Sequence, residues 1–330
     1  MKTTKLTTFT KLAAAALAVS LTMTGCAKED DGKLTIGVIQ YAAHPSLDNC
    51  YQGIENGLMA SSYADSITID LQNGNNDTAT CDSIAKSMAA KEYDMIFAIA
   101  TPAAQSAYAA VQSYDTPVIF CAVSDPVAAG LTVSLEAGTE KCIGTSDVLD
   151  FDAQLKLITA LQPDVKKIGV LYTTTEANSV SQLASFTEAA SAFGIEVVPQ
   201  GVSGAADIPQ AAASLAAKVD CINNFTDNNV VNNLGILIEK ANEAGIPVYG
   251  SEVEQVKNGC IASVSIDDIA LGEATAALGV QVLDGAEPSA LAVGTISDAS
   301  PVVNPDVMAR FNITLPAGYE NAEKVTASNE

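Results

Sequence analysis

Short apolar runs alternate with longer helix-like segments along most of this chain. The run Leu34–Gln40 is typical of a buried strand, and an amphipathic segment from about 47 to 61 follows it. Strands that alternate with helices of ten or more residues predict βαβ units and a parallel sheet. Further strands are predicted at 66–72, 95–100 and 117–122, with helices at 78–91 and 102–113.

The same alternation restarts halfway along the chain. Ile168–Tyr172 repeats the pattern of Ile36–Gln40, and Gly194 and Gly245 stand where helix C-termini favour glycine. We therefore predict an α/β protein of two lobes, each a parallel sheet flanked by helices, with a ligand cleft between the lobes. In the second half, strands are predicted at 196–201, 221–225, 247–250 and 260–266, and helices at 179–193, 208–218, 230–244 and 268–283.

The first 25 residues have the pattern of an export signal. Three lysines precede the uncharged apolar run Leu12–Met23, which is too short for a membrane-spanning helix. Gly25-Cys26 follows it and resembles the lipobox of bacterial lipoproteins, in which the cysteine carries the lipid, including palmitate. This interpretation predicts a signal peptide at 1–25, a tether at 26–32 and an acylated Cys26 on the extracytoplasmic face of the cell membrane. A plain secretory signal is the alternative.

Charge narrows the range of partners. The formal net charge is −23, so nucleic acid is excluded as a partner, and contact with anionic lipid has to depend on the acylated cysteine. The other six cysteines are scattered without metal-ligand spacing, so no metal site is expected. Disulfides are permitted in an exported chain, but the spacing leaves their connectivity open. These cysteines are Cys50, Cys81, Cys121, Cys142, Cys221 and Cys260.

Polar loops follow the predicted strands, and ligands of open α/β sheets bind at the carboxyl ends of strands. Thr101-Pro102 begins a predicted helix whose free N–H groups, including that of Ala103, favour an anion. The loops contain acids but neither lysine nor arginine, which favours a ligand with an ammonium group. The candidate residues in these loops are Tyr41, His44, Thr101, Pro102, Ala103, Ser124, Asp125, Glu176, Asn178, Ser179, Thr226, Asp227, Asn228 and Glu252.

Enzymatic chemistry has little support in the sequence. His44 is the single histidine, and the chain contains no Walker loop, no G-x-S-x-G and no G-x-G-x-x-G. The sequence therefore predicts a binding protein that has no cofactor and no catalytic residues.

Six short strings together resemble a known family. They follow one another in order over residues 33–315, and they resemble markers of the tryptophan/tyrosine-type ABC transporter substrate-binding lipoproteins, which have the type I periplasmic binding protein fold. The fourth string adds Ser146 and Asp147 to the candidate site. The strings are 44–48 (HPSLD), 100–105 (ATPAAQ), 124–126 (SDP), 144–147 (GTSD), 176–179 (EANS) and 226–228 (TDN).

The resemblance implies hinge closure on a small apolar, in particular aromatic, amino acid, and delivery of that ligand to an ABC permease with its ATPase. It also implies that the chain crosses between lobes more than once: lobe 1 is 33–146 plus 267–290, and lobe 2 is 147–266 plus 291–330. A sugar- or nucleoside-binding protein of the same fold is the alternative.

Within this hypothesis Asp227 is the first choice for the ammonium partner, followed by Asp147 or Glu176. Thr101, the N–H groups after it and Ser179 are expected to hold the carboxylate. The expected stacking partners for the ligand side chain are Tyr41, His44, Tyr172 and Phe225, of which Tyr172 and Phe225 could equally be core residues.

Overall fold

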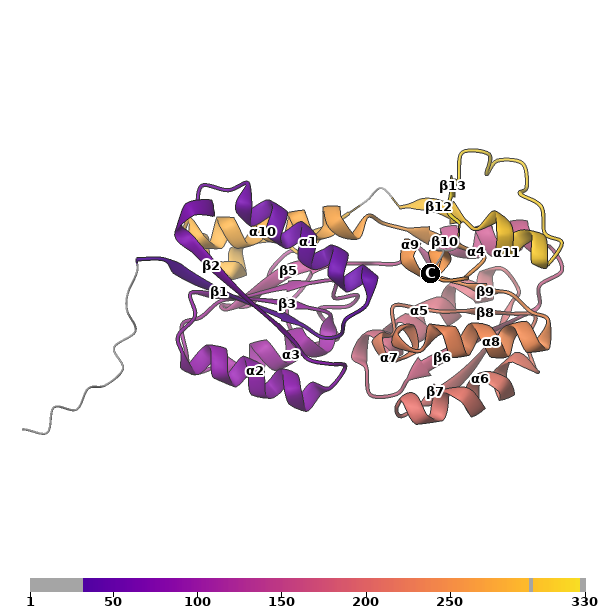
Figure 1. The fold of residues 1–330 in the computed structure, drawn as a ribbon, viewed down its shortest axis with the longest axis horizontal. Helices are drawn as coiled ribbons and strands as arrows, with labels where there is room; N and C mark the ends of the chain where they lie inside the picture. Colours follow the sequence, from indigo (N-terminus) through magenta and orange to yellow (C-terminus); the bar gives the residue numbers. More distant parts are fainter. Residues whose placement is uncertain (1–31, 297–298, 327–330) are drawn as a thin grey trace, which may run out of the picture. The chain divides into compact units, whose positions relative to one another are not determined.

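The computed structural model describes residues 32–296 and 299–326, and the predicted signal peptide and Cys26 lie outside this range. Residues 34–296 and 299–326 fold into two α/β lobes (Figure 1). The lobes have separate parallel sheets, so the predicted fold class is confirmed. None of the helices in the described part of the chain is long and apolar enough to cross a membrane.

Lobe 1 is built on a six-stranded sheet in the order β11-β5-β4-β3-β1-β2. Its paired strands are all parallel, and helices α1 and α10 cover one face while α2 and α3 cover the other (Figure 1). The elements of lobe 1 are β1 Leu34–Gln40, α1 Pro45–Met59, β2 Ile67–Asn73, α2 Thr78–Ala90, β3 Met95–Ile99, α3 Thr101–Ala110, β4 Val118–Cys121, β5 Cys142–Ser146, α10 Asp268–Leu283 and β11 Gly294–Thr295.

Lobe 2 contains a parallel sheet in the order β7-β6-β8-β9 and a smaller sheet in the order β10-β12-β13, in which β10 and β12 are antiparallel. Its elements are α4 Phe151–Leu161, β6 Lys167–Thr173, α5 Ala177–Ala192, β7 Glu196–Val202, α6 Ile208–Ala216, β8 Cys221–Asn223, α7 Asn228–Asn232, α8 Leu234–Ala244, β9 Val248–Tyr249, α9 Val253–Lys257, β10 Ala262–Ser265, β12 Ser300–Val303, α11 Pro305–Arg310 and β13 Glu323–Lys324.

The sheet of lobe 1 extends five residues beyond the predicted lobe boundary at 290. Gly294 and Thr295 pair with Thr145 and Ser146, so β11 completes the sheet of lobe 1 before the chain crosses to β12. A two-residue strand has no apolar run that would identify it in the sequence. The predicted single helix over 230–244 is also two helices, because the chain breaks at Asn233, whose side chain donates to the Asn229 carbonyl oxygen.

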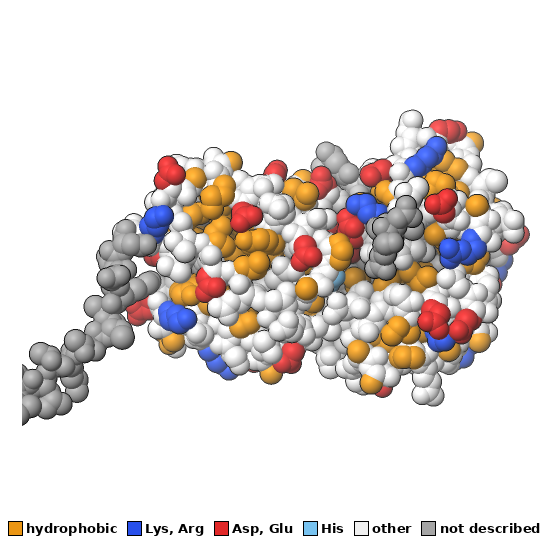
Figure 2. Space-filling view, in the orientation of Figure 1, with side chains coloured by type: hydrophobic (Ala, Val, Ile, Leu, Met, Phe, Trp, Pro, Cys, Tyr) orange, Lys and Arg blue, Asp and Glu red, His pale blue; other side chains and the backbone are white. Residues whose placement is uncertain are grey.

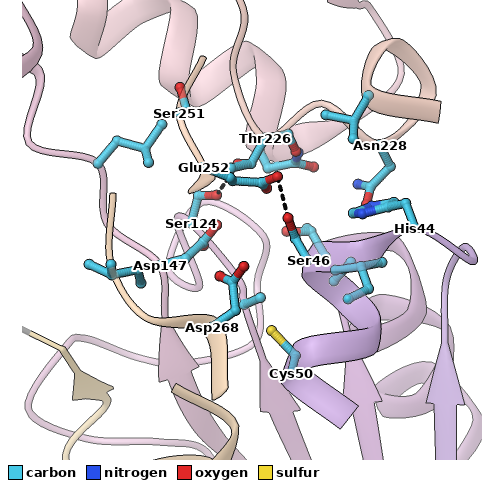
Figure 3. A pocket seen from close by; sticks show the side chains of 18 residues that line it. His44, Ser46, Cys50, Ser124, Asp147, Thr226, Asn228, Ser251, Glu252 and Asp268 are labelled. Carbon is cyan, nitrogen blue, oxygen red and sulfur yellow. Dashed lines mark hydrogen bonds between the residues drawn. The ribbon is translucent and has the colours of Figure 1, made fainter. Parts of the chain in front are cut away.

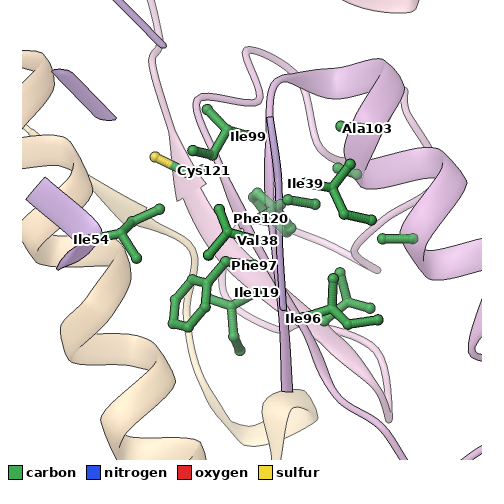
Figure 4. Packing of buried hydrophobic residues seen from close by; sticks show 14 of the residues in the cluster. Val38, Ile39, Ile54, Ile96, Phe97, Ile99, Ala103, Ile119, Phe120 and Cys121 are labelled. Atoms are coloured by element: carbon green, nitrogen blue, oxygen red, sulfur yellow. The ribbon is translucent and has the colours of Figure 1, made fainter. Parts of the chain in front are cut away.

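Each lobe has its own hydrophobic core. In lobe 1, Phe97 and Phe120 lie fully buried among branched aliphatic residues such as Ile39 and Ile54 (Figure 4). In lobe 2, Phe225 packs edge-to-face against Phe186, with the ring centroids 5.4 Å apart. The continuous apolar strands and the helices above them are what parallel sheets with two covered faces require.

Two helices of lobe 1 cross at unusually close range. Gly53 on α1 faces Gly272 on α10, and a Cβ atom on Gly53 would lie 2.8 Å from the Gly272 Cα. Only glycine allows backbones to approach this closely. The crossing brings Ser46 and Cys50, on the first turns of α1, to the same cavity as Asp268, the first residue of α10.

Candidate functional site

A cavity lies where the two lobes meet, and its walls come from the segments that follow the strands (Figure 3). The free space inside this cavity is about 20 Å³, roughly what one water molecule needs. A ligand of amino-acid size therefore requires the walls of the cavity to move apart. The lining residues are His44, Ser46, Leu47, Cys50, Ala100, Thr101, Ala122, Ser124, Asp147, Leu149, Asn178, Thr226, Asn228, Val231, Ser251, Glu252, Ile266 and Asp268.

Half of the predicted site residues line this cavity. They follow β1, β3, β4, β5, β6, β8 and β9, as the rule for strand ends requires. Tyr41, Pro102, Ala103, Asp125, Ser146, Glu176, Ser179 and Asp227 do not line it. Those that do are His44, Thr101, Ser124, Asp147, Asn178, Thr226, Asn228 and Glu252.

Asp227 is fully buried, and both oxygens of its carboxylate accept hydrogen bonds from lobe 2. Its Oδ2 accepts hydrogen bonds from the Thr173 N–H at 2.5 Å and the Ser179 hydroxyl at 2.8 Å. Its Oδ1 accepts from the Thr173 hydroxyl at 2.8 Å and the Val230 N–H at 2.9 Å. Asp227 thus caps α7 and ties it to the end of β6, and both oxygens are engaged away from the cavity.

Glu176 is likewise occupied at the start of α7. It accepts hydrogen bonds from the backbone N–H groups of Asn228 and Asn229, each at 3.1 Å. Burial, together with the nearby charge of Asp227, raises the pKa of Glu176 to about 7. Glu176 therefore orders the Asn228 segment of the cavity wall without lining the cavity itself.

Three carboxyl groups do face the cavity together. Asp147 follows β5, Glu252 precedes α9 and Asp268 begins α10, and Figure 3 shows all three around the same cavity, with the Glu252 carboxyl directed at Ser46. The Ser46 hydroxyl donates to Glu252 Oε2 at 2.5 Å. We call Asp147, Glu252 and Asp268 the acidic cluster. No lysine or arginine is among the described residues that line this cavity.

Burial governs the charge of the acidic cluster. It raises the pKa of Asp147 to about 6, and it raises the pKa values of Glu252 and Asp268 as well. Asp147 Oδ1 is buried and has no hydrogen-bond partner in the described part of the protein. A cationic group in the cavity would supply that partner and stabilise the ionised carboxyls.

A second wall of the cavity offers neutral polar groups. Thr101 begins α3, and its buried Oγ1 has no partner among the described residues. His44 lies on this side next to Asn228 (Figure 3), and burial lowers its pKa to about 4, so its imidazole is neutral at pH 7. A neutral ring and a helix start can donate hydrogen bonds to an anionic group without adding a charge.

Two alanines in the cavity wall have unusual backbone angles. Ala100, at the end of β3, has φ 77° and ψ 153°, and Ala122, at the end of β4, has φ 55°. Residues with a Cβ rarely adopt positive φ, and such conformations concentrate at functional sites. The sequence gives no signal for this feature, because alanine is not a residue that marks left-handed turns.

The predicted stacking partners are mostly core residues. Phe225 belongs to the aromatic core of lobe 2, Tyr172 packs against the same core, and buried Tyr41 belongs to the core of lobe 1. Of the four candidates, only His44 lines the cavity. The apolar part of the lining is instead aliphatic and comprises Leu47, Leu149, Val231 and Ile266.

Acidic side chains are scattered over the face of the protein in Figure 2, with only isolated basic side chains between them. The six cysteines in the described range are buried and carry free thiols. Cys50 lines the cavity, whereas Cys121 belongs to the core of lobe 1 beneath it.

Two parallel α/β lobes whose strand ends meet at a shared polar cavity define a two-lobed binding protein. The model of the family described as ABC transporter substrate binding protein matches residues 35–325. The chain belongs to this family, whose members bind substrates and are not enzymes. The family expected from the sequence motifs is thereby confirmed.

Three relatives cover nearly the whole chain. A tyrosine-binding protein of Clostridioides difficile (strain R20291) is 38% identical over 310 residues, which is 89% of both proteins. The structure of an ABC domain in complex with L-Trp from Streptococcus pneumonia is 34% identical, covering 89% of this chain and 99% of that one, with a TM-score of 0.86. A ligand-free, open structure of a substrate-binding protein with adhesive properties from Clostridium difficile is 36% identical, covering 89% and 100%, with a TM-score of 0.69.

Proposed function

We propose that this protein is the lipid-anchored, extracytoplasmic binding subunit of an ABC importer, and that its ligand is an aromatic amino acid. The observation that carries the proposal is the acidic cluster in a cavity lined by strand ends. Two relatives support the ligand class: the tyrosine-binding protein, at 38% identity, and the ABC domain in complex with L-Trp, at 34% identity.

In this proposal the ligand ammonium binds the acidic cluster, with Asp147 Oδ1 as its first acceptor. This assignment replaces Asp227, whose oxygens are engaged by α7 and β6. The ligand carboxylate lies at Thr101 and the N-terminus of α3, where partial positive charge favours an anion. The side chain then lies against the aliphatic residues of the lining.

We infer that the lobes of this structure are in a closed arrangement. Sequence identity to the Trp-bound and the open relatives is similar, 34% and 36%, yet the TM-score falls from 0.86 to 0.69. A difference in lobe arrangement would account for the lower value, since the aligned share of this chain is 89% in both cases. Hinge closure around the ligand is the motion that this difference supports.

Calorimetric titration with tyrosine, tryptophan, phenylalanine and leucine tests the ligand class. We expect at least one aromatic amino acid to bind with a Kd below about 100 μM, which corresponds to roughly −5.5 kcal/mol. Pentoses and nucleosides in the same series test the alternative that the protein binds sugars or nucleosides. Failure of every amino acid at that threshold would overturn the proposal.

The membrane anchor needs a separate experiment. The full chain and its Cys26→Ser variant should be expressed in a bacterium that processes lipoproteins, and the mature N-terminus should be analysed by mass spectrometry. We expect an acylated cysteine and membrane association for the full chain, and loss of both in the variant. Release of both proteins into the soluble fraction would favour a plain secretory signal.

A further inference from the structure

Two hydrogen bonds join the lobes outside the cavity. The Ser181 hydroxyl on α5 of lobe 2 donates to Asp125 Oδ2 in the loop after β4 of lobe 1, at 2.5 Å. On another part of the boundary, Asn49 Nδ2 on α1 of lobe 1 donates to Glu254 Oε1 on α9 of lobe 2, at 3.3 Å. None of these four residues lines the cavity.

Both acceptors are held in place by their own lobes. Asp125 Oδ1 accepts a hydrogen bond from the Ala128 N–H at 2.9 Å, which fixes the carboxylate on its loop. Glu254 Oε1 forms an ion pair with Lys257 at 2.8 Å, one turn along α9. Each carboxylate therefore already points at the lobe boundary, and only the donor has to arrive from the other lobe.

The hydrogen bonds that join the lobes inside the cavity differ from these two, because they involve residues that a ligand can contact. Ser46–Glu252 and Gln182–Ser124, the latter at 2.8 Å, also join the lobes, but each includes a residue that lines the cavity. A ligand can replace or rearrange those bonds. Asp125–Ser181 and Asn49–Glu254 lie outside its reach, so they depend on closure alone.

We propose that the pairs Asp125–Ser181 and Asn49–Glu254 are closure latches, by which we mean hydrogen bonds between the lobes that form only in the closed state. Their residues are positioning residues, which influence ligand affinity without contacting the ligand. The inference rests on the proposed function. A bond that exists only in the closed state shifts the equilibrium between open and closed protein by its own free energy. The apparent Kd rises by up to the corresponding factor, and by less where part of the ligand-free protein is already closed. Every ligand is affected by the same factor, so selectivity among ligands stays constant.

Ser181→Ala and Asn49→Ala, singly and together, test the latches. A net hydrogen-bond contribution of about 0.5–1.5 kcal/mol corresponds to a Kd increase of roughly 2- to 13-fold for each variant. We expect the two factors to multiply in the double variant, because the pairs share no residue. Kd ratios for tyrosine, tryptophan and phenylalanine should stay within about twofold of the wild-type ratios.

Ser185→Ala is the matched control. Ser185 is exposed on the same helix, one turn after Ser181, and should leave the Kd unchanged. Solution scattering gives an independent measurement: the double variant without ligand should be more open than the wild type, and saturating ligand should return it to the wild-type closed profile. Thermal melts of all variants report whether they fold.

The outcomes separate the latches from the proposed function. Unchanged Kd values and unchanged scattering in the double variant would overturn the latches while the wild-type titration still supported the function. A changed selectivity would also overturn them, because it would show contact with the ligand. If the wild type binds no amino acid, an opening of the double variant in scattering still supports the latches, and an identical profile overturns them.

Discussion

Gly53 and Gly272 are in backbone contact: a Cβ on Gly272 would lie 2.9 Å from the Gly53 Cα and closer still to the Cys50 carbonyl oxygen. Their helices carry Ser46 and Asp268 to the cavity at their first turns. The fit of these two glycines therefore determines how near the acidic cluster comes to α1.

Gly53→Ala should destabilise the protein by at least about 2 kcal/mol, since the added methyl group meets backbone atoms that cannot move aside cheaply. Urea unfolding measures the effect. Gly235→Ala, on α8 with no atom within 4 Å of its added Cβ, is the control and should stabilise by up to about 1 kcal/mol. Equal stability of the two variants would contradict the close crossing.

Asp227→Asn should chiefly reduce stability, by about 2 kcal/mol or more, because an amide cannot accept all four hydrogen bonds that the buried carboxylate accepts. Glu252→Gln is the comparison: it should weaken ligand binding with a smaller effect on unfolding. If Asp227→Asn instead melts like the wild type and abolishes binding, Asp227 is the ammonium partner after all.

Ligand affinity should weaken as the pH falls from about 8 to 5. The pKa of Asp147 is raised to about 6, so acidification protonates the carboxylate that is proposed to hold the ammonium. Asp147→Asn should weaken binding by roughly 10- to 100-fold, as expected for a hydrogen bond to a charged group, and should flatten the pH profile. Calorimetry at several pH values measures both. A wild-type Kd that is independent of pH would exclude Asp147 as the anchor.

Asp147 and Glu176 also make the folding stability depend on pH. This dependence has the opposite sign to that of ligand affinity, because stability decreases as the pH rises. A carboxyl whose pKa is raised in the folded state binds a proton more readily there than in the unfolded chain, so its contribution to stability falls as pH rises. For Asp147 this loss spans pH 4 to about 6, and for Glu176 it extends to about pH 7. Urea unfolding of the ligand-free protein should show a smaller loss over this range in Asp147→Asn than in the wild type.

Ala100→Gly should leave stability unchanged or raise it by about 1 kcal/mol, because glycine adopts φ 77° without strain. Ala100→Val should cost more than 2 kcal/mol, since a β-branched residue is disfavoured at this angle and the site is buried. A valine variant as stable as the wild type would contradict the backbone angles of this wall.

The fold could be predicted largely from the sequence, because buried parallel strands leave continuous apolar runs. Leu34–Gln40 and the helix Asp268–Leu283 were predicted with the bounds that the structure shows, and Gly194 and Gly245 have the positive φ expected after a helix. Cys142–Ser146 was missed as a strand, since it is short and contains glycine and hydroxyl residues.

The site was predicted less completely, for two physical reasons. The sequence shows which residues belong to a strand-end loop, but packing decides which of their side chains face the cavity. Asn228 faces the cavity, and the adjacent Asp227 does not. The second reason is that Cys50 and Asp268 reach the cavity from helices, through the α1–α10 crossing, and no strand-end rule includes them.

The hydrophobic clusters of the two lobes share no residue in the described part of the chain. Cavity residues such as Leu149 and Val231 belong to none of these clusters. Substitutions at these two positions change the walls that meet a ligand while both cores keep their packing. Evolution can therefore reshape the cavity at these positions one mutation at a time, and each intermediate protein keeps the cores on which its folding depends.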